Sequence, residues 1–321
     1  MAYTAENWPI AANMLPFGNK AADGTPNTEA PAESWRDQLQ QVVDLDFEFV
    51  DPTDAWLSIG ELSDERFSEF VDVLDEVGLK IPSISTTRSS VVDKTPYAGG
   101  GTMGEQYLAR AHKIIDRAPT LGANMVNIGY MQGLTPAQAK AQWFWLEDGH
   151  HDDLNDKATR DLAIARTREL ADHAKEKSVG LSLEMYEDTY IGTPDLAVEF
   201  LHDLNHDNIG LNPDLGNIVR LHREIEDINT MFDKVLPYTN FWHIKNYTRD
   251  FDPSTGAYAT HPAPLVSGTV NYRQQIRKAL DHGFNGVFVV EHYGSDSLGV
   301  GALNRDYIKQ VLSSYLRHKK S

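Results

Sequence analysis

The sequence contains no cysteine in its 321 residues. This absence excludes disulfide bonds, thiolate zinc sites and cysteine nucleophiles, and it leaves histidine, aspartate and glutamate as the side chains able to bind a metal. The chain also lacks an apolar run long enough to cross a membrane, and its N-terminus lacks the features of a secretory signal. We therefore expect a cytoplasmic protein without a membrane partner.

Positive charge is scarce as well. The chain has 29 Lys and Arg residues against 47 Asp and Glu residues, for a formal net charge of −18. Such an excess of negative charge repels nucleic acid, and no dense basic segment offsets it. Hydrophobic residues form 41% of the chain, which is enough apolar material for a large core. The composition predicts a globular protein that does not bind nucleic acid.

Short β-prone segments alternate along the chain with segments of helical periodicity. Alternation of this kind predicts a parallel sheet covered by helices. The β-prone segments are residues 8–17, 46–50, 80–85, 124–130, 180–186, 209–214, 240–244 and 286–291. The helical segments are residues 64–77, 105–121, 156–177, 194–204, 225–236, 272–282 and 304–316.

Eight strands that alternate with helices are typical of a (β/α)₈ TIM barrel, and the length suits one domain of that kind. We predict a single-domain α/β barrel over residues 1–321. Residues 18–33, rich in Gly and Pro, are expected to form a long loop, and residues 132–155 a loop insertion after the fourth strand. An open, doubly wound sheet shares the alternation and is the alternative, although no GxGxxG motif follows the first strand.

Four polar side chains stand where the fifth to eighth strands are expected to end: Glu184, Asp214, His243 and Glu291. These strands are adjacent in a barrel, so the side chains meet at its C-terminal mouth. Neighbouring carboxylates repel one another, and a divalent cation resolves that repulsion. A single carboxylate at a strand end is usually solvated or caps a helix, but four at the same relative position favour a metal. This ligand set suits Mn²⁺, which we place first, and also Mg²⁺, Co²⁺ or Zn²⁺.

Further residues are candidates for binding a substrate. Lys245 shares a strand face with His243, so it points into the mouth, where it polarises a substrate oxygen or pairs with a carboxylate. Arg88 follows the third strand in a segment rich in Ser and Thr. Trp145, in the insertion, either lines a pocket for a flat group or packs over the loop. The residues alone leave binding and structural roles open.

The quartet and its surroundings resemble the xylose-isomerase-like superfamily of sugar isomerases and epimerases, over nearly the whole chain. The resemblance implies that the Glu, Asp, His and Glu bind one metal ion. It also implies that Arg249, six residues after His243, contacts the substrate as an Arg does in the related ketose 3-epimerases, although a surface position is equally compatible. Those epimerases typically carry a substrate-binding His where this sequence has Asn217, which puts plain ketose epimerisation in doubt and makes Asn217 the expected contact. The segments that carry the resemblance are LSLEMYED, GLNPDLGN, FWHIKNYTRD and VVEHYGS.

Within this superfamily the chain looks like the large subunits of bacterial C-glycoside deglycosidases. The similarity lies in the His150 and His151 pair, the preceding aromatic and acidic residues, the insertion after the fourth strand and the overall length. It implies a lyase that cleaves the carbon–carbon bond between a 3-oxo-glucosyl unit and an aromatic aglycone, in a hetero-oligomer with a small β-rich subunit. A histidine suits removal of a phenol proton near neutral pH, which makes His150, and after it His151, the candidate base. The alternative is that this pair is a solvated feature of the loop or caps the following helix.

The main alternative is a metal-dependent sugar isomerase or epimerase. Both reactions begin with removal of a proton next to a ketone, and in the isomerase that proton returns to carbon, with Glu184 and Glu291 as candidate bases. A phosphodiesterase of the endonuclease IV type uses the same barrel, but it needs several metals and more histidines. A non-catalytic sugar-binding barrel is the remaining alternative, because a fold does not prove an activity.

Overall fold

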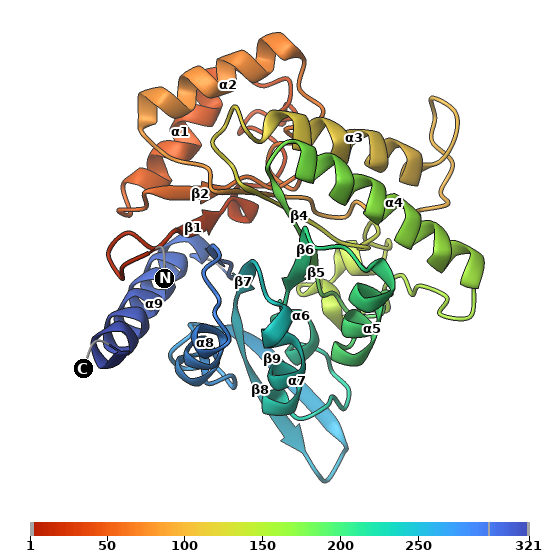
Figure 1. Ribbon diagram of the computed structural model, residues 1–321, viewed down its shortest axis with the longest axis vertical. Coiled ribbons are helices and arrows are strands. Elements are labelled where there is room, and N and C mark those ends of the chain that lie inside the picture. The colour runs from red at the N-terminus through yellow and green to blue at the C-terminus, as the bar shows by residue number, and fades with distance from the viewer. Residues whose placement is uncertain (1–2, 295, 320–321) are drawn as a thin grey trace.

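The computed structural model describes residues 3–294 and 296–319 of the chain. Parallel strands form its centre, and helices surround them (Figure 1). The central strands are β1 (Ile10–Asn13), β2 (Phe49–Asp51), β3 (Ser83–Ser85), β4 (Met125–Ile128), β5 (Gly180–Glu184), β6 (Ile209–Asn212), β7 (Trp242–Ile244) and β10 (Phe288–Val290). The helices are α1 (Ala32–Val43), α2 (Asp64–Val77), α3 (Met103–Arg117), α4 (Lys157–Glu176), α5 (Pro194–Leu204), α6 (Gly216–Val219), α7 (Ile228–Val235), α8 (Tyr272–Asp281) and α9 (Ser297–Lys319).

The eight central strands close into a barrel. Their ladders form two parallel groups, in the orders β2-β1-β10-β7 and β3-β4-β5-β6. The N–H of Val50 donates to the carbonyl of Lys80 at 2.9 Å, which joins β2 to the segment that enters β3. The N–H of Asn240 donates to the carbonyl of Leu211 at 3.2 Å, which joins β6 to the segment that enters β7. Since the two groups meet at both edges, the predicted (β/α)₈ barrel is confirmed and the open sheet is excluded.

Local sequence signals set the ends of the helices. The side chain of Ser63 accepts a hydrogen bond from the N–H of Arg66 at 3.1 Å and begins α2. Gly78 ends this helix with a φ of +75°, a left-handed conformation that favours glycine. Thr102 and Glu105 form a reciprocal capping box at the start of α3. Helix α2 covers the residues predicted for it because both of its ends carry such signals.

Helix α1 is absent from the sequence-based prediction. Its buried residues Trp35, Leu39 and Val42 recur at helical spacing, so the signal is present in the sequence. The loop predicted at residues 18–33 lies between β1 and this helix, and the helix begins inside its last two residues, at Ala32.

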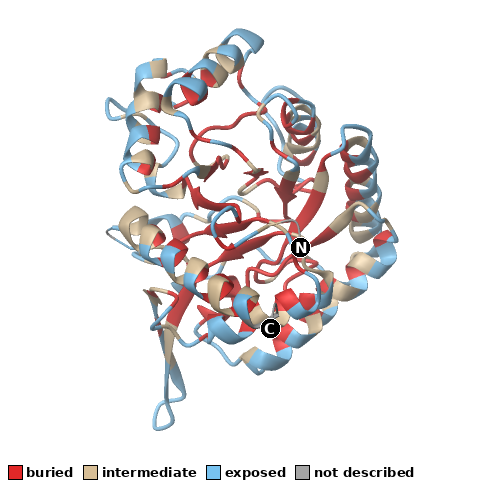
Figure 2. Cartoon of the chain, turned by 60° about the vertical axis from the view of Figure 1, so that its left-hand side comes forward, coloured by how far each residue is buried: buried red, intermediate tan, exposed pale blue. Residues whose placement is uncertain are grey.

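A second unpredicted feature is an antiparallel hairpin. Strands β8 (Asn246–Asp252) and β9 (Ala257–Ala263) pair along their whole length and project from the barrel beyond β7 (Figure 1). The tip of the hairpin is exposed (Figure 2). β8 begins only two residues after β7 ends, so the sequence gives no clear boundary between the two strands. The structure separates them by their pairing, because β7 pairs with β10 and β8 pairs with β9.

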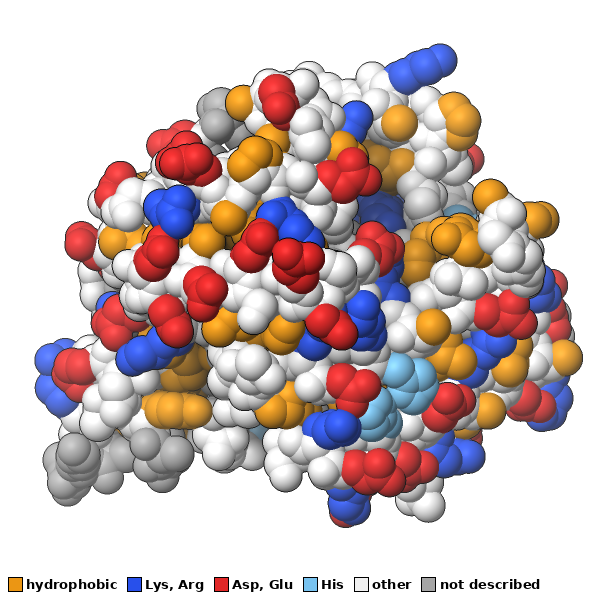
Figure 3. All heavy atoms as spheres, turned by 90° about the horizontal axis from the view of Figure 1, so that it is seen from above, with side chains coloured by type: hydrophobic (Ala, Val, Ile, Leu, Met, Phe, Trp, Pro, Cys, Tyr) orange, Lys and Arg blue, Asp and Glu red, His pale blue; other side chains and the backbone are white. Residues whose placement is uncertain are grey.

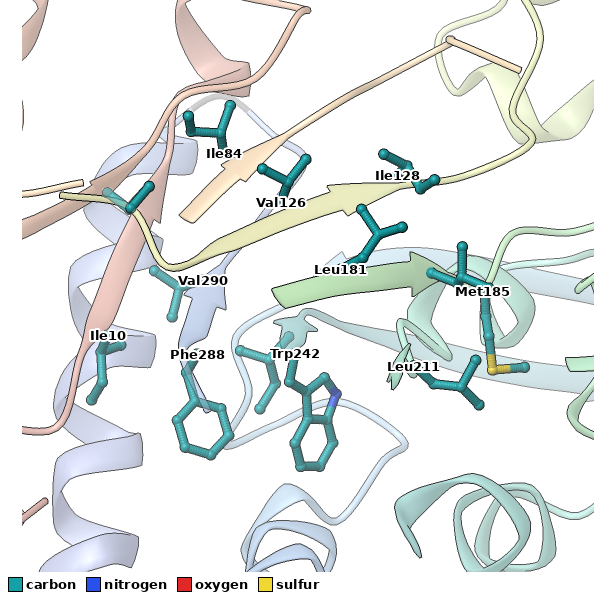
Figure 4. Packing of buried hydrophobic residues seen from close by; sticks show 14 of the residues in the cluster. Ile10, Ile84, Val126, Ile128, Leu181, Met185, Leu211, Trp242, Phe288 and Val290 are labelled. Atoms are coloured by element: carbon teal, nitrogen blue, oxygen red, sulfur yellow. The ribbon is translucent and has the colours of Figure 1, made fainter. Parts of the chain in front are cut away.

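Alternation along the strands sorts side chains into two layers. In β5, Leu181 and Leu183 belong to the large core between strands and helices, whereas Ser182 and Glu184 lie on the opposite, inner face. Figure 4 shows this outer core, and Figure 2 shows that the strands are buried while the helices expose one face. A separate apolar cluster belongs to the inner face: Ala11, Phe241, Val287 and Val289. The polar inner residues therefore gather above an apolar floor.

The surface carries charges of both signs. On the face shown in Figure 3, acidic side chains are interspersed with lysines and arginines, so this face has no broad basic area for a polyanion. No helix in the described part of the chain combines the length and the apolar character that crossing a membrane requires.

Candidate metal centre and adjoining pocket

Three side chains meet at the C-terminal ends of β5, β6 and β7. Glu184, Asp214 and His243 each offer a ligand atom, and these atoms lie within 4.8 Å of one another. All three residues are buried, with exposed fractions of 5%, 0% and 3%. Two carboxylates and one imidazole at this spacing suit a divalent cation.

Strand geometry explains why these side chains meet. Glu184 ends β5 and His243 is the central residue of β7, and both occupy inward-facing positions. Asp214 follows β6 after Asn212 and Pro213, and its N–H donates to the carbonyl of Asn212 at 2.8 Å. This tight turn places the Asp214 carboxylate beside the strand ends rather than in the solvent.

A lysine holds Glu291, the fourth member of the predicted quartet. Lys245 Nζ lies 2.8 Å from Glu291 Oε1 and 2.7 Å from Asp214 Oδ2. The second oxygen of Glu291, Oε2, lies 3.5 Å from His243 Nδ1. Of the two roles that the sequence left open for Lys245, the structure shows the pairing with carboxylates.

The buried groups alter one another's protonation. Burial raises the pKa of Asp214 to about 7, against the attraction of Lys245. Burial opposes the charged form of His243, but Glu184 and the other nearby carboxylates raise its pKa to about 9. Burial also acts to raise the pKa of Glu291, while Lys245 and His243 hold it below its ordinary value. The carboxylates of the centre therefore stabilise a positive charge placed among them, such as that of protonated His243.

Polar neighbours orient these side chains. Ser85 Oγ lies 3.0 Å from His243 Nε2, while His243 Nδ1 lies 3.4 Å from Glu184 Oε2. Asn127 Nδ2 donates to Glu184 Oε2 at 2.8 Å, and Asn217 Nδ2 donates to Glu184 Oε1 at 3.3 Å. Asn217, a predicted substrate contact, therefore also holds one of the candidate metal ligands.

Asp51 is a buried carboxylate that the sequence analysis missed. It ends β2, is fully buried and accepts a hydrogen bond from Ser83 Oγ. Burial raises its pKa to about 7, although His243 acts to lower it. The strand predicted at residues 46–50 stops one residue short of Asp51, so the strand-end signal does not reach it.

A buried atom of the centre shows that the residues present fit a cation. Asp214 Oδ1 has no hydrogen-bond partner among the described residues. Leaving a buried polar group unpaired costs about 1–3 kcal/mol, and native proteins contain few such groups. Carboxylate oxygen and imidazole nitrogen are ligands of divalent cations. Glu184, Asp214 and His243 therefore fit a divalent metal ion, with Glu291 beside them.

Aromatic side chains and one arginine cover the centre. Arg220, just after α6, is fully buried, and its Nη2 donates to the two carboxylate oxygens of Glu187 at 2.8 and 2.9 Å. Its Cζ lies 4.7 Å from the ring centroid of Phe144 and 5.2 Å from that of Trp145. The ring of Trp145 meets that of Tyr293 edge-on at 5.4 Å. Arg220 has no distinctive sequence signal, since it lies outside the strand-end pattern.

A pocket of about 230 Å³ adjoins this cover. The insertion after β4 forms one wall with the short helices η2 (Gln138–Lys140) and η3 (Phe144–Leu146), and the loops after β5 and β6 form the other. The predicted residues Arg88, Trp145 and His150 all line it. The volume is below that of sites for drug-sized ligands, so the pocket suits a single ring.

The two loop histidines have different surroundings. His150 Nε2 lies 2.6 Å from Gln132 Nε2 and 3.5 Å from Asp152 Oδ1, and burial lowers the pKa of His150. His151 Nδ1 lies 3.7 Å from Asp188 Oδ1, with 55% of its side chain exposed. Neither histidine bonds to a strand-end carboxylate within the described chain. Their role as bases stays a prediction.

Arg249, a predicted substrate contact, is engaged elsewhere. Its Nη1 donates to the carbonyl of Val219 at 3.0 Å and to that of Leu221, and its Nη2 donates to the carbonyl of Arg223. Its Cζ lies 4.2 Å from the ring centroid of Tyr258. Arg249 therefore joins the β8–β9 hairpin to the loop after α6, and these contacts point to a structural role.

Arg88 remains well placed for a ligand. It has a φ of +57°, which is unusual for a residue other than glycine and turns the chain after β3. Its Cζ lies 4.7 Å from the ring centroid of Phe144 and 5.4 Å from that of Tyr186. Its Nη1 donates to the carbonyl of Gln132 at 3.3 Å, so Arg88 holds the insertion at the pocket.

The closed parallel barrel and the buried carboxylate–imidazole cluster at its C-terminal end define a class, the TIM barrels with a candidate metal centre at the strand ends. A family model described as "Xylose isomerase-like TIM barrel" matches residues 39–316. The chain belongs to this family.

Three known proteins illustrate the range of similarity. A xylose isomerase-like TIM barrel protein from Mycobacterium smegmatis, solved in complex with magnesium, is 60% identical, with a TM-score of 0.92 over 98% of this chain and 99% of that chain. The L-ribulose-5-phosphate 3-epimerase of Salmonella paratyphi B is 22% identical over 292 residues, which are 88% of this chain and 91% of the relative. A solved L-ribulose 3-epimerase is 15% identical, with a TM-score of 0.65 over 98% of this chain and 97% of that chain. The last similarity concerns the fold alone.

Proposed function

We propose that the protein is a divalent-metal-dependent isomerase or epimerase of a keto sugar. The observation that carries this proposal is the buried cluster of Glu184, Asp214 and His243, with Glu291 beside it. A relative named as an L-ribulose-5-phosphate 3-epimerase supports it as well. The support is therefore stronger for sugar isomerisation or epimerisation, the alternative in the sequence analysis, than for C-glycoside cleavage.

The proposed reaction moves a proton at the carbon next to a ketone. A bound divalent cation supplies Lewis-acid stabilisation of the negative charge that develops on the substrate oxygens. Glu184 Oε2 lies 3.4 Å from His243 Nδ1, and Glu291 Oε2 lies 3.5 Å from the same atom. The two carboxylates are therefore close neighbours at the ends of their strands.

One carboxylate takes the proton from carbon. For epimerisation the other carboxyl group, which is protonated at the start, returns a proton to the opposite face of the same carbon. For isomerisation the same group returns the proton to the neighbouring carbon, and the hydroxyl proton passes to the former carbonyl oxygen. The step needs no further reactant.

Neighbouring residues keep these carboxylates in place. Asn127 and Asn217 hold Glu184 through one oxygen each, and Lys245 holds Glu291. Glu184 and Glu291 are buried, and burial strengthens the electrostatic interactions inside the centre. The base is therefore oriented before the substrate binds.

For the metal we propose Mg²⁺ or Mn²⁺. Oxygen-rich ligand sets suit both ions. The Mycobacterium smegmatis protein is described in complex with magnesium, and its 60% identity supports the same ion here. Mn²⁺, the ion placed first on sequence grounds, stays a prediction.

Solvent-proton exchange tests the proposal. The protein with Mg²⁺ or Mn²⁺ is incubated in deuterated water with a panel of ketoses and 3-keto-glucosides, and deuterium at carbon is followed by NMR. We expect exchange that EDTA abolishes and that Glu184→Gln and Glu291→Gln each reduce at least about 100-fold. Glu199→Gln, which removes a carboxylate from the exposed pair with Arg160, is the matched control. Binding of a sugar without any exchange would favour a non-catalytic sugar-binding barrel instead.

A second candidate is the C-glycoside lyase of the sequence analysis. The observation that favours it is the ring-sized pocket, where Arg88, Trp145 and His150 gather beside the centre. This candidate includes a small β-rich partner subunit. Release of free aglycone from a 3-oxo-C-glucoside, dependent on the partner and lost in His150→Gln, would support it. Deuterium exchange into ketoses without aglycone release would rule it out.

A further inference from the structure

A buried ion pair lies at the wall of the pocket. Arg220 is fully buried and Glu187 is 8% exposed. The ring centroids of Trp145 and Tyr186 each lie 5.2 Å from the Arg220 guanidinium, and both rings line the pocket together with Glu187. Trp145 also packs edge-on against the ring of Tyr247 in β8 at 5.5 Å and against that of Tyr293 at 5.4 Å, and Lys245 Nζ lies 5.5 Å from the ring centroid of Tyr293. These contacts link the Arg220–Glu187 pair to the metal centre.

Several buried donors around this pair lack a hydrogen-bond partner within residues 3–294 and 296–319. They are Arg220 Nε and Nη1 and Trp145 Nε1. Each unpaired donor costs about 1–3 kcal/mol, so a folded protein tolerates such a group mainly where a ligand or water pairs with it. Because all of these atoms can donate, they match a ligand with many oxygen acceptors.

The charges around the pocket disfavour an anionic ligand. Arg223 pairs with Asp188 at 2.6 Å. Burial lowers the pKa of His150 and of His222, which favours the neutral form of both imidazoles. Four carboxylates and two guanidinium groups line the pocket, from Glu147, Asp148, Glu187, Asp188, Arg88 and Arg223. Carboxylates outnumber the cations, so a phosphate dianion would be repelled here.

We propose that Arg220 and Glu187 form a subsite for uncharged sugar oxygens, which selects a keto sugar without phosphate over its phosphorylated counterpart. The inference rests on the proposed function, which places the ketone at the metal centre. Arg220 donates from Nε and Nη1 to hydroxyl oxygens of the substrate, and Glu187 cancels the charge that would otherwise attract a phosphate. Arg220 and Glu187 are specificity residues, and neither takes part in proton transfer.

Paired ligands that differ only in a phosphate test the inference. Binding of L-ribulose and L-ribulose 5-phosphate, and of D-fructose and D-fructose 6-phosphate, is measured by calorimetry at one fixed concentration of free Mg²⁺. We expect the uncharged member of a pair to bind at least about tenfold more tightly. Glu187→Gln leaves Arg220 with its charge uncompensated, so it should shift this ratio at least about fivefold toward the phosphate. Asp188→Asn should shift it in the same direction, because it frees Arg223 at the rim of the pocket.

The control and the outcomes separate this inference from the proposed function. Glu199→Gln removes one carboxylate from an exposed ion pair of α5 and should leave the ratio unchanged. Equal or tighter binding of the phosphorylated members by the unmodified protein overturns the inference. An unchanged ratio in both Glu187→Gln and Asp188→Asn, with circular dichroism showing folded proteins, also overturns it. Tight binding of an uncharged ketose without deuterium exchange supports the subsite and contradicts only the proposed reaction.

Discussion

Lys245 Nζ lies 2.7 Å from Asp214 Oδ2, inside the group of side chains that suits a divalent cation. An ammonium group in this place competes with a metal ion for the same carboxylates. At the surface, Lys234 bridges Asp195 and Glu226 in a comparable way, at 2.8 and 2.6 Å. The two lysines differ in burial, since 2% of the Lys245 side chain and 31% of the Lys234 side chain are exposed. Comparing their substitutions therefore shows how much of any change in stability and metal affinity depends on burial.

Lys245→Met is expected to destabilise the metal-free protein and to strengthen metal binding. Removing one partner of a buried ion pair costs about 3–5 kcal/mol of unfolding free energy, because the other charges stay buried. Melting curves in EDTA and in Mg²⁺, with calorimetric titration of Mg²⁺, measure both effects. Lys234→Met, the control nearer the surface, should change stability little and leave Mg²⁺ affinity unchanged. Weaker Mg²⁺ binding by Lys245→Met would contradict the competition between lysine and metal.

Ser85→Ala is expected to weaken metal binding by about 10- to 100-fold, because Ser85 Oγ orients the His243 ring through Nε2. Isothermal titration with Mg²⁺ or Mn²⁺ measures the change. Ser182→Ala is the matched control, since Ser182 is also buried on an inner strand face and its Oγ has no partner in the described chain. Equal losses in the two variants would mean that the effect is one of packing.

Asp152→Asn is expected to change how stability depends on pH. Burial raises the pKa of Asp152 to about 7 from an ordinary value of 3.8, although the N–H of Tyr190 donates to its Oδ2 at 2.9 Å. The protonated Asp152 contributes its full share of folding stability below pH 3.8, and this contribution is lost as the pH rises through about 7. The variant, which cannot ionise, should therefore gain stability relative to the unmodified protein between about pH 5 and about pH 8. Urea unfolding at the two pH values measures it, and a pH-independent difference would contradict the burial argument.

Arg249→Met is expected to loosen the β8–β9 hairpin while leaving the chemistry of the metal centre intact. The guanidinium donates to three backbone carbonyls of residues 219–223, and loss of these bonds frees the segment. Hydrogen exchange should become faster in residues 246–263 and 219–223 and stay unchanged in α2. A large rise in KM with unchanged hydrogen-exchange rates would contradict the structural role. It would support the substrate contact that the resemblance to the epimerases implies for Arg249.

Much of the fold was predictable because its signals are local. Apolar periodicity within each segment and caps such as Ser63 and Gly78 place α2 at the residues where the structure has it. The same signals were available for α1, whose buried residues are regularly spaced, so its omission reflects a missed pattern. The β8–β9 hairpin was not predictable in this way, because β8 follows β7 with one residue between them and only strand pairing separates the two.

By itself, the amino-acid sequence determined the alternation of strands and helices and the positions of Glu184, Asp214 and His243 at strand ends. The reason is that alternation is a short-range property, and the C-terminal ends of parallel strands share one face. Only the tertiary structure decided that the strands close into a barrel, that Lys245 pairs with Asp214 and that Arg220 pairs with Glu187 beside the pocket. Long, flexible side chains select their partners from groups distant in sequence, and burial then decides which of those pairings persist.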